Sequence, residues 1–398
     1  MNIAGTIPPF ICDHKNLTIL DFYDNTFIGM FPVALFNCSK LRYLSLSFNY
    51  FVGVIPDDID VFSGLSFLDL SGNNFTEIGN LSNLQVLSMA YNGFLPSSFS
   101  SNFTQLKQLK WFSISYSNLF GEILETTGEM VALEHLDLNI PSSLFLLKNL
   151  IVLYLYRNKL SGEIPWKMPD DFGKLQNLSV LNLFYNQLSS EIPKSIGRLP
   201  ALIHFSLLSV NLSGVLPPDL GRYSMLKTVE ASSNKLTGRL LEFLCNRGKL
   251  VGVSGYNNNL NGELPESLGN CSSLLMMSIS RNAVTSNIPI GLWTASNLRY
   301  LMLSSNLFTG ELLDEVSRNL RRLEISNNMF SGKISTEASW RNLMFFNASN
   351  NLFCGTIPQE LTAFPLVITL LLENDAYNSS FLNNPSLCTR NSLLSLNL

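Results

Sequence analysis

Charge, histidine and long apolar runs are scarce in this sequence. Asp, Glu, Lys and Arg make up 14% of the 398 residues, and the formal net charge is −4. No basic stretch could track a phosphate backbone, so a nucleic acid partner is disfavoured. The longest apolar run near the C-terminal end, Leu366 to Leu372, spans seven residues, whereas a membrane helix needs about 20. The segment that begins at Met1 also lacks the basic and apolar regions of a signal peptide.

Catalytic and metal-binding patterns are missing as well. The three histidines, His14, His135 and His204, are far apart in the sequence. No CxxC pair, Gly-rich phosphate loop, kinase HRD or DFG element, or GxSxG turn occurs. We therefore expect neither an enzyme nor a cofactor or metal site, and we predict a protein that binds a partner.

A repeat with the register LxxLxLxxNxLxGxIP runs through the chain. Each copy is anchored on the first residue of its LxL segment, and most anchors are 24 residues apart, within the range of leucine-rich repeats. The spacing shrinks to 19 after Leu68 and to 17 after Leu136, and it stretches to 28 after Leu153. The 16 anchors are Leu20, Leu44, Leu68, Leu87, Phe112, Leu136, Leu153, Leu181, Phe205, Val229, Val253, Met277, Leu301, Leu323, Phe346 and Thr369.

Two further columns support this register independently of the apolar residues. Asn stands five residues after the anchor in 13 of the 16 copies: Asn25, Asn49, Asn73, Asn92, Asn158, Asn186, Asn234, Asn258, Asn282, Asn306, Asn328, Asn351 and Asn374. Pro recurs 12 residues after the anchor at Pro32, Pro56, Pro165, Pro193, Pro217, Pro265, Pro289 and Pro358.

Each column has a physical explanation. The anchor and the residue two positions later point to the same face of a short strand, so we expect both to be buried between coils. The Asn turns the chain out of the strand, and its amide is expected to satisfy backbone groups of its own and the next coil. One coil cannot bury its own apolar face, so stability comes from stacking. The pattern predicts an α/β solenoid over residues 1–375, with a parallel β-sheet on its concave face.

The GxIP half of the repeat resembles the plant class of leucine-rich repeats. More narrowly, the chain resembles the ectodomains of plant leucine-rich-repeat receptor-like kinases of the HAESA-like group. The passages that carry this are GTIPPFICDHKNLTILDF, LYLYRNKLSGEIP, LSGVLPPDLGRYSMLKTVEASSNKLTG and AYNSSFLNNPSLC. The last passage resembles a C-terminal cap, so residues 376–398 are expected to be a remnant of that cap, whereas the N-terminal cap is missing.

The resemblance implies an extracellular or plasma-membrane location and two partners. One is a small secreted peptide bound on the concave surface, and the other is a shorter leucine-rich-repeat co-receptor kinase near the C-terminal repeats. It also implies an Arg-x-Arg pair that holds the peptide's terminal carboxylate. Here the matching segment reads Arg322-Leu-Glu324, and a glutamate repels a carboxylate. We expect a different ligand, or one held elsewhere, and Arg322 and Glu324 are also able to pair with each other.

The candidate binding surface follows from the register. Positions one before and one, three and four after each anchor face outward on the concave side, and aromatic side chains there suit peptide capture. The candidates are Trp111, Tyr154, Tyr156, Arg157, Phe184, Tyr185, Tyr256, Arg299, Tyr300, Arg322 and Glu324. The wider aromatic set adds Tyr23, Tyr43, Phe48, Phe67, Tyr91 and Tyr116.

The spacing of four cysteines predicts two disulfides, which would imply an oxidising compartment. Cys12 and Cys38 repeat the offsets of Cys245 and Cys271 in pairs of adjacent coils, which stack at about 5 Å, close to disulfide geometry. Two disulfides, Cys12–Cys38 and Cys245–Cys271, are predicted, with buried free thiols as the alternative; Cys354 and Cys388 lack partners. The ten Asn-x-Ser/Thr signals are Asn16, Asn37, Asn74, Asn80, Asn102, Asn177, Asn211, Asn270, Asn347 and Asn378.

Three functions compete at this point. The leading hypothesis is a peptide-hormone receptor ectodomain. The second is a secreted inhibitor of cell-wall hydrolases, a class that uses the same repeat type with about ten copies. The third is a non-functional fragment of a receptor gene, because a first coil without its cap exposes apolar edges.

Overall fold

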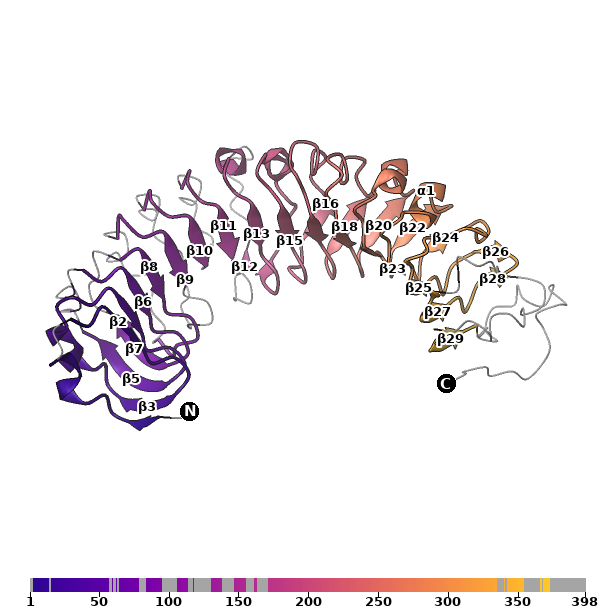
Figure 1. Ribbon diagram of the computed structural model, residues 1–398. Helices are drawn as coiled ribbons and strands as arrows, with labels where there is room; N and C mark the ends of the chain where they lie inside the picture. Colours follow the sequence, from indigo (N-terminus) through magenta and orange to yellow (C-terminus); the bar gives the residue numbers. More distant parts are fainter. Residues whose placement is uncertain are drawn as a thin grey trace. The chain divides into compact units, whose positions relative to one another are not determined.

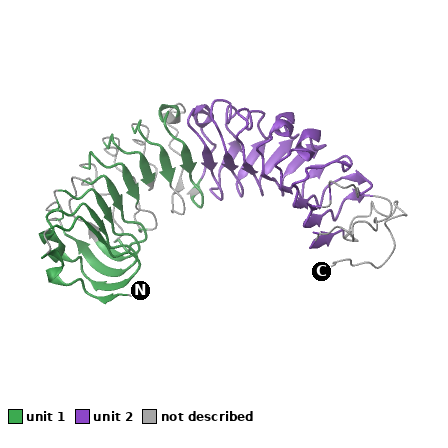
Figure 2. Ribbon diagram, viewed as in Figure 1, with its two compact units in different colours: residues 1–188 green, residues 189–398 purple. Residues whose placement is uncertain are grey.

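The computed structural model describes residues 3–13, 16–56, 59, 62, 64–78, 84–94, 106–113, 117, 130–137, 147–154, 161–162, 171–334, 340, 342–353, 366 and 368–372. The chain divides into two compact units, unit 1 (Met1–Leu188) and unit 2 (Ser189–Leu398), coloured green and purple in Figure 2. The expected cap remnant at 376–398 lies outside the described residues, as do Cys354 and Cys388.

Each unit is a solenoid whose coils contribute one short strand apiece to a parallel sheet (Figure 1). In unit 1 the strands follow in chain order: β2 (Ile19–Asp21), β4 (Tyr43–Ser45), β6 (Phe67–Asp69), β8 (Val86–Ser88), β9 (Trp111–Ser113), β10 (His135–Asp137), β11 (Val152–Tyr154) and β13 (Val180–Asn182). In unit 2 they are β15 (His204–Ser206), β17 (Thr228–Glu230), β19 (Gly252–Ser254), β21 (Met276–Ser278), β23 (Tyr300–Met302), β25 (Arg322–Glu324), β27 (Phe345–Asn347) and β29 (Thr369–Leu371). The solenoid prediction is confirmed.

The register of these strands agrees with 15 of the 16 predicted anchors. Each anchor is the middle residue of its strand and lies beside the anchor of the next coil, as Leu20 does beside Leu44. The prediction of Thr369 as the last anchor is wrong, because Phe346 pairs with Leu370. Leu370 is buried and Thr369 is only half-buried. Asn374 suggests the wrong register because it stands five residues after Thr369, the spacing of the turn asparagine in the other coils.

The asparagine column forms a hydrogen-bond ladder through the described coils that carry it. Asn49 Nδ2 donates to the carbonyls of Leu46 and Ser47 in its own coil and of Phe22 in the preceding coil, at 3.1, 3.1 and 2.8 Å. Its Oδ1 accepts the Phe27 N–H at 3.0 Å. The prediction that the amide serves its own and the next coil is therefore wrong in direction. The turn after the strand directs the asparagine side chain toward the preceding coil.

A second set of short strands lies lateral to the main sheet in each unit. Unit 1 has the parallel order β1 (Ala4–Gly5), β3 (Thr26–Gly29), β5 (Tyr50–Ile55) and β7 (Asn74–Ile78). Unit 2 has β16 (Ser213–Val215), β18 (Lys235–Gly238), β20 (Asn259–Gly262), β22 (Ala283–Ser286) and β24 (Leu307–Phe308). Shorter pairs join β12 (Ser161–Gly162) to β14 (Gln187–Leu188) and β26 (Ser331–Gly332) to β28 (Leu352–Phe353).

Short helices form the remaining side of the coils. They include η1 (Pro9–Cys12), η2 (Val33–Asn37), η7 (Asp171–Lys174), η8 (Lys194–Arg198), η9 (Glu266–Asn270) and α1 (Ile290–Trp293). The repeat's Pro is the residue before η2, η8, η9 and α1, where its fixed φ suits entry into the helix and no N–H is lost. Within the described part of the chain, no helix is long and apolar enough to cross a membrane.

Candidate functional site

The outward side of the main strands carries most of the predicted binding residues. The strand face is defined as the side chains one before and one, three and four after each anchor. On β9, Trp111 is 39% exposed while the next residue, Phe112, is fully buried. This alternation separates core from surface in the short strands. Side chains on the strand face are therefore presented by a rigid backbone.

In unit 1 the strand face is built from aromatic pairs. Tyr43 and Phe67 occupy the same position on adjacent strands and stack with ring centroids 4.1 Å apart and planes 9° apart. Trp111 stacks on His135 at 4.4 Å in the same way. The pairs follow from the sequence, because residues with a ring recur one position before the anchor in neighbouring coils. Side chains at the same position of adjacent strands contact each other.

The candidates Tyr154, Tyr156, Arg157, Phe184 and Tyr185, which fall on two adjacent coils, are described only in part. Tyr156 and Arg157 lie outside the described residues. Tyr154 is half-buried and lies beside Asn182 on the next strand. Phe184 and Tyr185 meet edge to face with centroids 5.3 Å apart, and Tyr185 is 48% exposed.

Several exposed aromatic residues stand where the backbone gives no reason for them. The residue four after the anchor adopts a left-handed conformation, with φ of 53° at Phe48, 56° at Tyr91 and 54° at Tyr185. Bulky residues rarely adopt this conformation, whereas Asn and Gly do so readily. Other coils indeed place Asn257 or Asn327 there. An aromatic ring at this position runs against the backbone preference, and about half of its surface stays exposed (46% at Phe48 and Tyr91, 48% at Tyr185), which makes it the strongest candidate for partner contact.

Electrostatics differ along unit 1. Burial raises the pKa of Tyr43, and the carboxylates of Asp21 and Asp69 on the flanking strands raise it further. Burial lowers the pKa of His135, against a smaller opposing effect of Glu134. The Nδ1 atom of His135 is buried with no hydrogen-bond partner among the described residues. The charged groups that act on Tyr43 in this part of the strand face are both carboxylates.

In unit 2 the strand face carries Arg281 and Arg322 as well as Glu230 and Glu324. The Arg281 guanidinium lies 5.4 Å from the Tyr256 ring centroid. Arg299 and Tyr300 are exposed at adjacent positions where β23 begins. Cations beside aromatic rings bind carboxylates and polar peptide groups.

Arg322 and Glu324 are already paired with each other. The Arg322 Nε donates to Glu324 Oε1. The guanidinium carbon also lies 4.1 Å from the ring centroid of Phe345, which sits one strand further on in the same column. Phe345 was missed from the sequence, although its offset from the anchor is that of Tyr300. The Arg322 side chain is therefore held by its neighbours.

Comparison with known proteins agrees with this geometry. The leucine-rich-repeat family models match residues 15–75, 177–199 and 297–318. The ectodomain of the Arabidopsis receptor kinase HAESA, solved with an extended IDA peptide hormone, is 30% identical. That match covers 93% of this chain and 73% of that structure, with a TM-score of 0.62. The chain belongs to the plant leucine-rich-repeat receptor ectodomains.

Two further proteins of the same kind are similar to this ectodomain. The plant peptide hormone receptor RGFR1 in complex with RGF2 is 28% identical with a TM-score of 0.75, over 94% of this chain and 66% of that structure. Receptor-like protein 52 of Arabidopsis thaliana is 44% identical over 80 residues, which are 18% of this chain and 10% of that relative. This ectodomain therefore matches only a small part of the curated relative.

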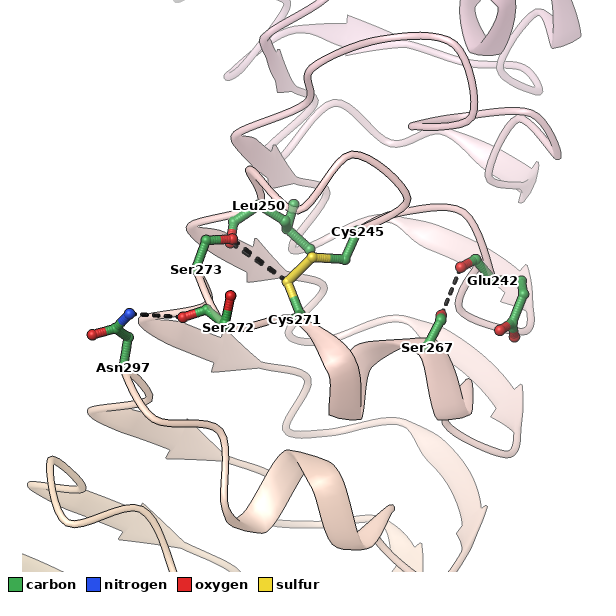
Figure 3. Close-up of a disulfide and its surroundings, with 8 residues drawn as sticks. All are labelled: Glu242, Cys245, Leu250, Ser267, Cys271, Ser272, Ser273 and Asn297. Carbon is green, nitrogen blue, oxygen red and sulfur yellow. Dashed lines mark hydrogen bonds between the residues drawn. A yellow bond between two sulfur atoms is a disulfide. The ribbon is translucent and has the colours of Figure 1, made fainter.

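Both predicted cysteine pairs form disulfides in the structure. Cys12 joins Cys38 with a Cα–Cα distance of 4.9 Å, and Cys245 joins Cys271 at 5.8 Å (Figure 3). Each staples one coil to the next. Among the described residues, no group of His, Cys, Asp and Glu could hold a metal ion.

The glycosylation signals are mostly accessible. The exposed ones are Asn16, Asn37, Asn74, Asn177, Asn211 and Asn270. Asn347 is half-buried on the strand face, and its Oδ1 accepts hydrogen bonds from the N–H and hydroxyl of Ser349. Asn80, Asn102 and Asn378 lie outside the described residues.

Proposed function

We propose that this ectodomain binds a small secreted peptide on its strand face. The observation that carries the proposal is the set of exposed aromatic rings at left-handed positions, Phe48, Tyr91 and Tyr185. A bulky residue in this conformation costs on the order of 1 kcal/mol, and about half of each ring surface stays exposed, 46% at Phe48 and Tyr91 and 48% at Tyr185. Contact with a ligand supplies a physical reason for it. Rigid Tyr and Phe side chains also lose little entropy on binding.

The solved neighbours support the same proposal. The structures similar to this chain include RGFR1 with RGF2, PEPR1 with AtPEP1, and HAESA with IDA and the co-receptor SERK1. By analogy, the proposal includes a shorter co-receptor kinase that docks near the C-terminal repeats once the peptide is bound, and a location on the extracellular side of the plasma membrane.

The paired Arg322 narrows the class of ligand. Because Glu324 neutralises it and Phe345 covers it, a peptide carboxylate would have to displace both interactions to bind there. The proposed ligand is therefore anchored mainly through aromatic contacts, with Arg281 and Arg299 as the accessible cations.

Calorimetric titration with synthetic RGF2, IDA and AtPEP1 peptides tests the proposal. For a peptide that binds, Tyr185→Ala should weaken affinity by about tenfold or more, the loss of a buried aromatic anchor. Tyr223→Ala is the matched control, because Tyr223 is equally exposed (47% against 48%) but lies away from the strand face. Equal effects of the two substitutions, or no binding by any peptide of the panel, would refute the proposal in this form.

A further inference from the structure

The lateral sheet of unit 1 exposes an unusual amount of apolar surface. Strands β3 and β5 and the residue after β3 present five large side chains to solvent, together called the lateral apolar patch: Ile28, Met30, Tyr50, Val52 and Val54. Their exposed fractions run from 41% to 68%. The intervening residues Phe27, Phe51 and Ile55 point inward and are buried. Contiguous exposed apolar surface of this kind is normally covered by something.

The lateral sheet of unit 2 has the same backbone and a different surface. Its exposed residues are mostly polar, namely Lys235, Thr237, Asn259 and Asn261, and its two large exposed apolar residues, Val215 and Leu307, lie on the first and last of its strands. The strands pair with the same stagger, as Ser213 beside Lys235 in unit 2 and Ile28 beside Tyr50 in unit 1 show. The apolar patch is therefore not a requirement of the repeat.

A glycosylation signal borders the lateral apolar patch. Asn74 begins β7 and lies directly beside Val52 in the parallel register. Their neighbours Phe51 and Phe75 are both buried and stack with ring planes 6° apart. Side chains of paired residues point to the same side of a sheet, so Asn74 and Val52 both face solvent on the apolar side.

The neighbouring coil leaves space for the Asn74 side chain. A Cβ atom added to Gly93 would overlap the Asn74 Oδ1. Gly93 stands at the same offset from its anchor as Asn74, six residues. The Asn74 amide therefore occupies the space that a side chain at Gly93 would fill, and no hydrogen bond holds this amide among the described residues.

We propose that Asn74 carries an N-linked glycan whose inner sugars cover the lateral apolar patch. The strand of Ile28 lies two strands from Asn74, about 10 Å away, which two linked sugar rings span. The C–H faces of the rings pack on Tyr50 and Val52, and the sugar hydroxyls face water. The glycan thus replaces an aggregation-prone surface by a hydrated one.

The attachment uses the ordinary chemistry of the secretory pathway. The donor is a lipid-linked oligosaccharyl diphosphate, and the host's transferase catalyses the step. A bond forms between Asn74 Nδ2 and the anomeric carbon while the anomeric C–O bond to the diphosphate breaks. The amide loses one proton, and the lipid diphosphate leaves with the electron pair of the broken bond. The signal is completed by Thr76.

Asn211 provides a matched control within the same chain. It stands six residues after its anchor, Phe205, as Asn74 does after Leu68. It also belongs to a glycosylation signal and is exposed. Its coil adjoins the polar strand that begins at Lys235. A glycan at Asn211 therefore has no apolar patch to cover.

The test uses the chain secreted from eukaryotic cells behind a cleavable signal peptide. Glycopeptide mass spectrometry should find Asn74 predominantly occupied. Asn74→Gln should raise the fluorescence of a dye that binds apolar surface by about twofold or more and increase self-association on size exclusion. Asn211→Gln should leave both signals unchanged. Adding Tyr50→Ser and Val52→Thr to Asn74→Gln should return both signals toward the original values.

Two results would overturn the proposal. One is secreted, folded protein with Asn74 unoccupied. The other is unchanged dye binding after the glycan has been removed. If Asn74→Gln is not secreted, enzymatic deglycosylation of the folded wild-type protein gives the same comparison. None of these outcomes depends on whether the strand face binds a peptide.

Discussion

The two units of this ectodomain share one backbone frame and present different chemistry on it. In both, the anchors are buried, turn asparagines such as Asn49 and Asn306 make the same set of hydrogen bonds, and one disulfide joins adjacent coils. The strand face of unit 1 carries stacked rings and carboxylates such as Asp21 and Asp69, whereas that of unit 2 also carries arginines beside aromatic rings, Arg281 next to Tyr256 and Arg322 next to Phe345. The repeat therefore fixes where a side chain points and leaves its chemistry open.

This separation of frame from surface has a physical basis. A frame position is satisfied by neighbouring coils on both sides, so its residue type is dictated by volume and hydrogen bonding. A strand-face position meets only its cross-strand neighbours, which are worth a fraction of 1 kcal/mol each. Predictions about the frame should therefore hold equally in both units, and predictions about the faces should not.

The largest expected effect comes from the asparagine ladder. Asn49 in unit 1 and Asn306 in unit 2 are equally buried, at 6% exposure each. Each Nδ2 donates to three carbonyls, and each Oδ1 accepts one N–H. Substitution by Ala leaves these groups unpaired inside the stack, so each should lower the free energy of unfolding by about 3 kcal/mol. Urea unfolding measures the loss.

The ladder prediction has an internal control. Asn297 is exposed and donates a single hydrogen bond, to the Ser272 carbonyl, so Asn297→Ala should cost much less. A clear difference between Asn49→Ala and Asn306→Ala would break the claim that the two units share one frame.

Loss of a disulfide should lower stability somewhat less than loss of a ladder asparagine, and it tests the same comparison between the two units. Cys12–Cys38 and Cys245–Cys271 both close a separation of 26 residues. In the chain-entropy view each should stabilise its coils by about 3 kcal/mol at most, with less where the reduced chain keeps structure. Replacing either pair by two alanines should therefore lower the unfolding midpoint in guanidinium chloride by similar amounts. Four free thiols at these positions in exported protein would contradict the bridges themselves.

The frame could be predicted from the sequence because its signals are redundant. The same register is indicated by the anchors, such as Leu20 and Leu44, by the Asn residues and by the Pro residues. An error in one of these columns therefore leaves the predicted register unchanged. Thr369 was misassigned where only one signal remained. The lateral strands were missed because their outward residues, such as Tyr50 and Lys235, share no residue type from coil to coil.

The candidate site was harder to predict for the opposite reason. Its positions follow from the register, but the interactions among its side chains depend on three-dimensional neighbours. The sequence already allows Arg322 to pair with Glu324, whereas its packing on Phe345 depends on the position of the next strand. The left-handed backbone at Tyr185 likewise could not be predicted, because it depends on the conformation of the turn that precedes the asparagine.

The smallest expected effect compares two histidines at one position of the repeat. His135 in unit 1 and His204 in unit 2 both stand one residue before their anchors. His204 Nδ1 forms a hydrogen bond with Thr228 Oγ1 at 2.8 Å. His135 instead stacks on Trp111, and its Nδ1 is buried without a partner among the described residues. The same frame position therefore has a satisfied imidazole in one unit and an unsatisfied one in the other.

The pH dependence follows from the lowered pKa of His135. Because the folded state disfavours the imidazolium, the unfolded chain binds more protons below the ordinary pKa of about 6.5. Stability from the neutral form is then fully present above that value and declines as the pH falls through it toward the lower folded pKa. Thermal unfolding between pH 7.5 and pH 5 should show this decline, in steps of about half a pH unit. His135→Phe, which keeps a ring against Trp111, should flatten it, and His204→Phe should leave it in place. A wild-type profile that His135→Phe does not change would show that burial of this ring carries no proton linkage.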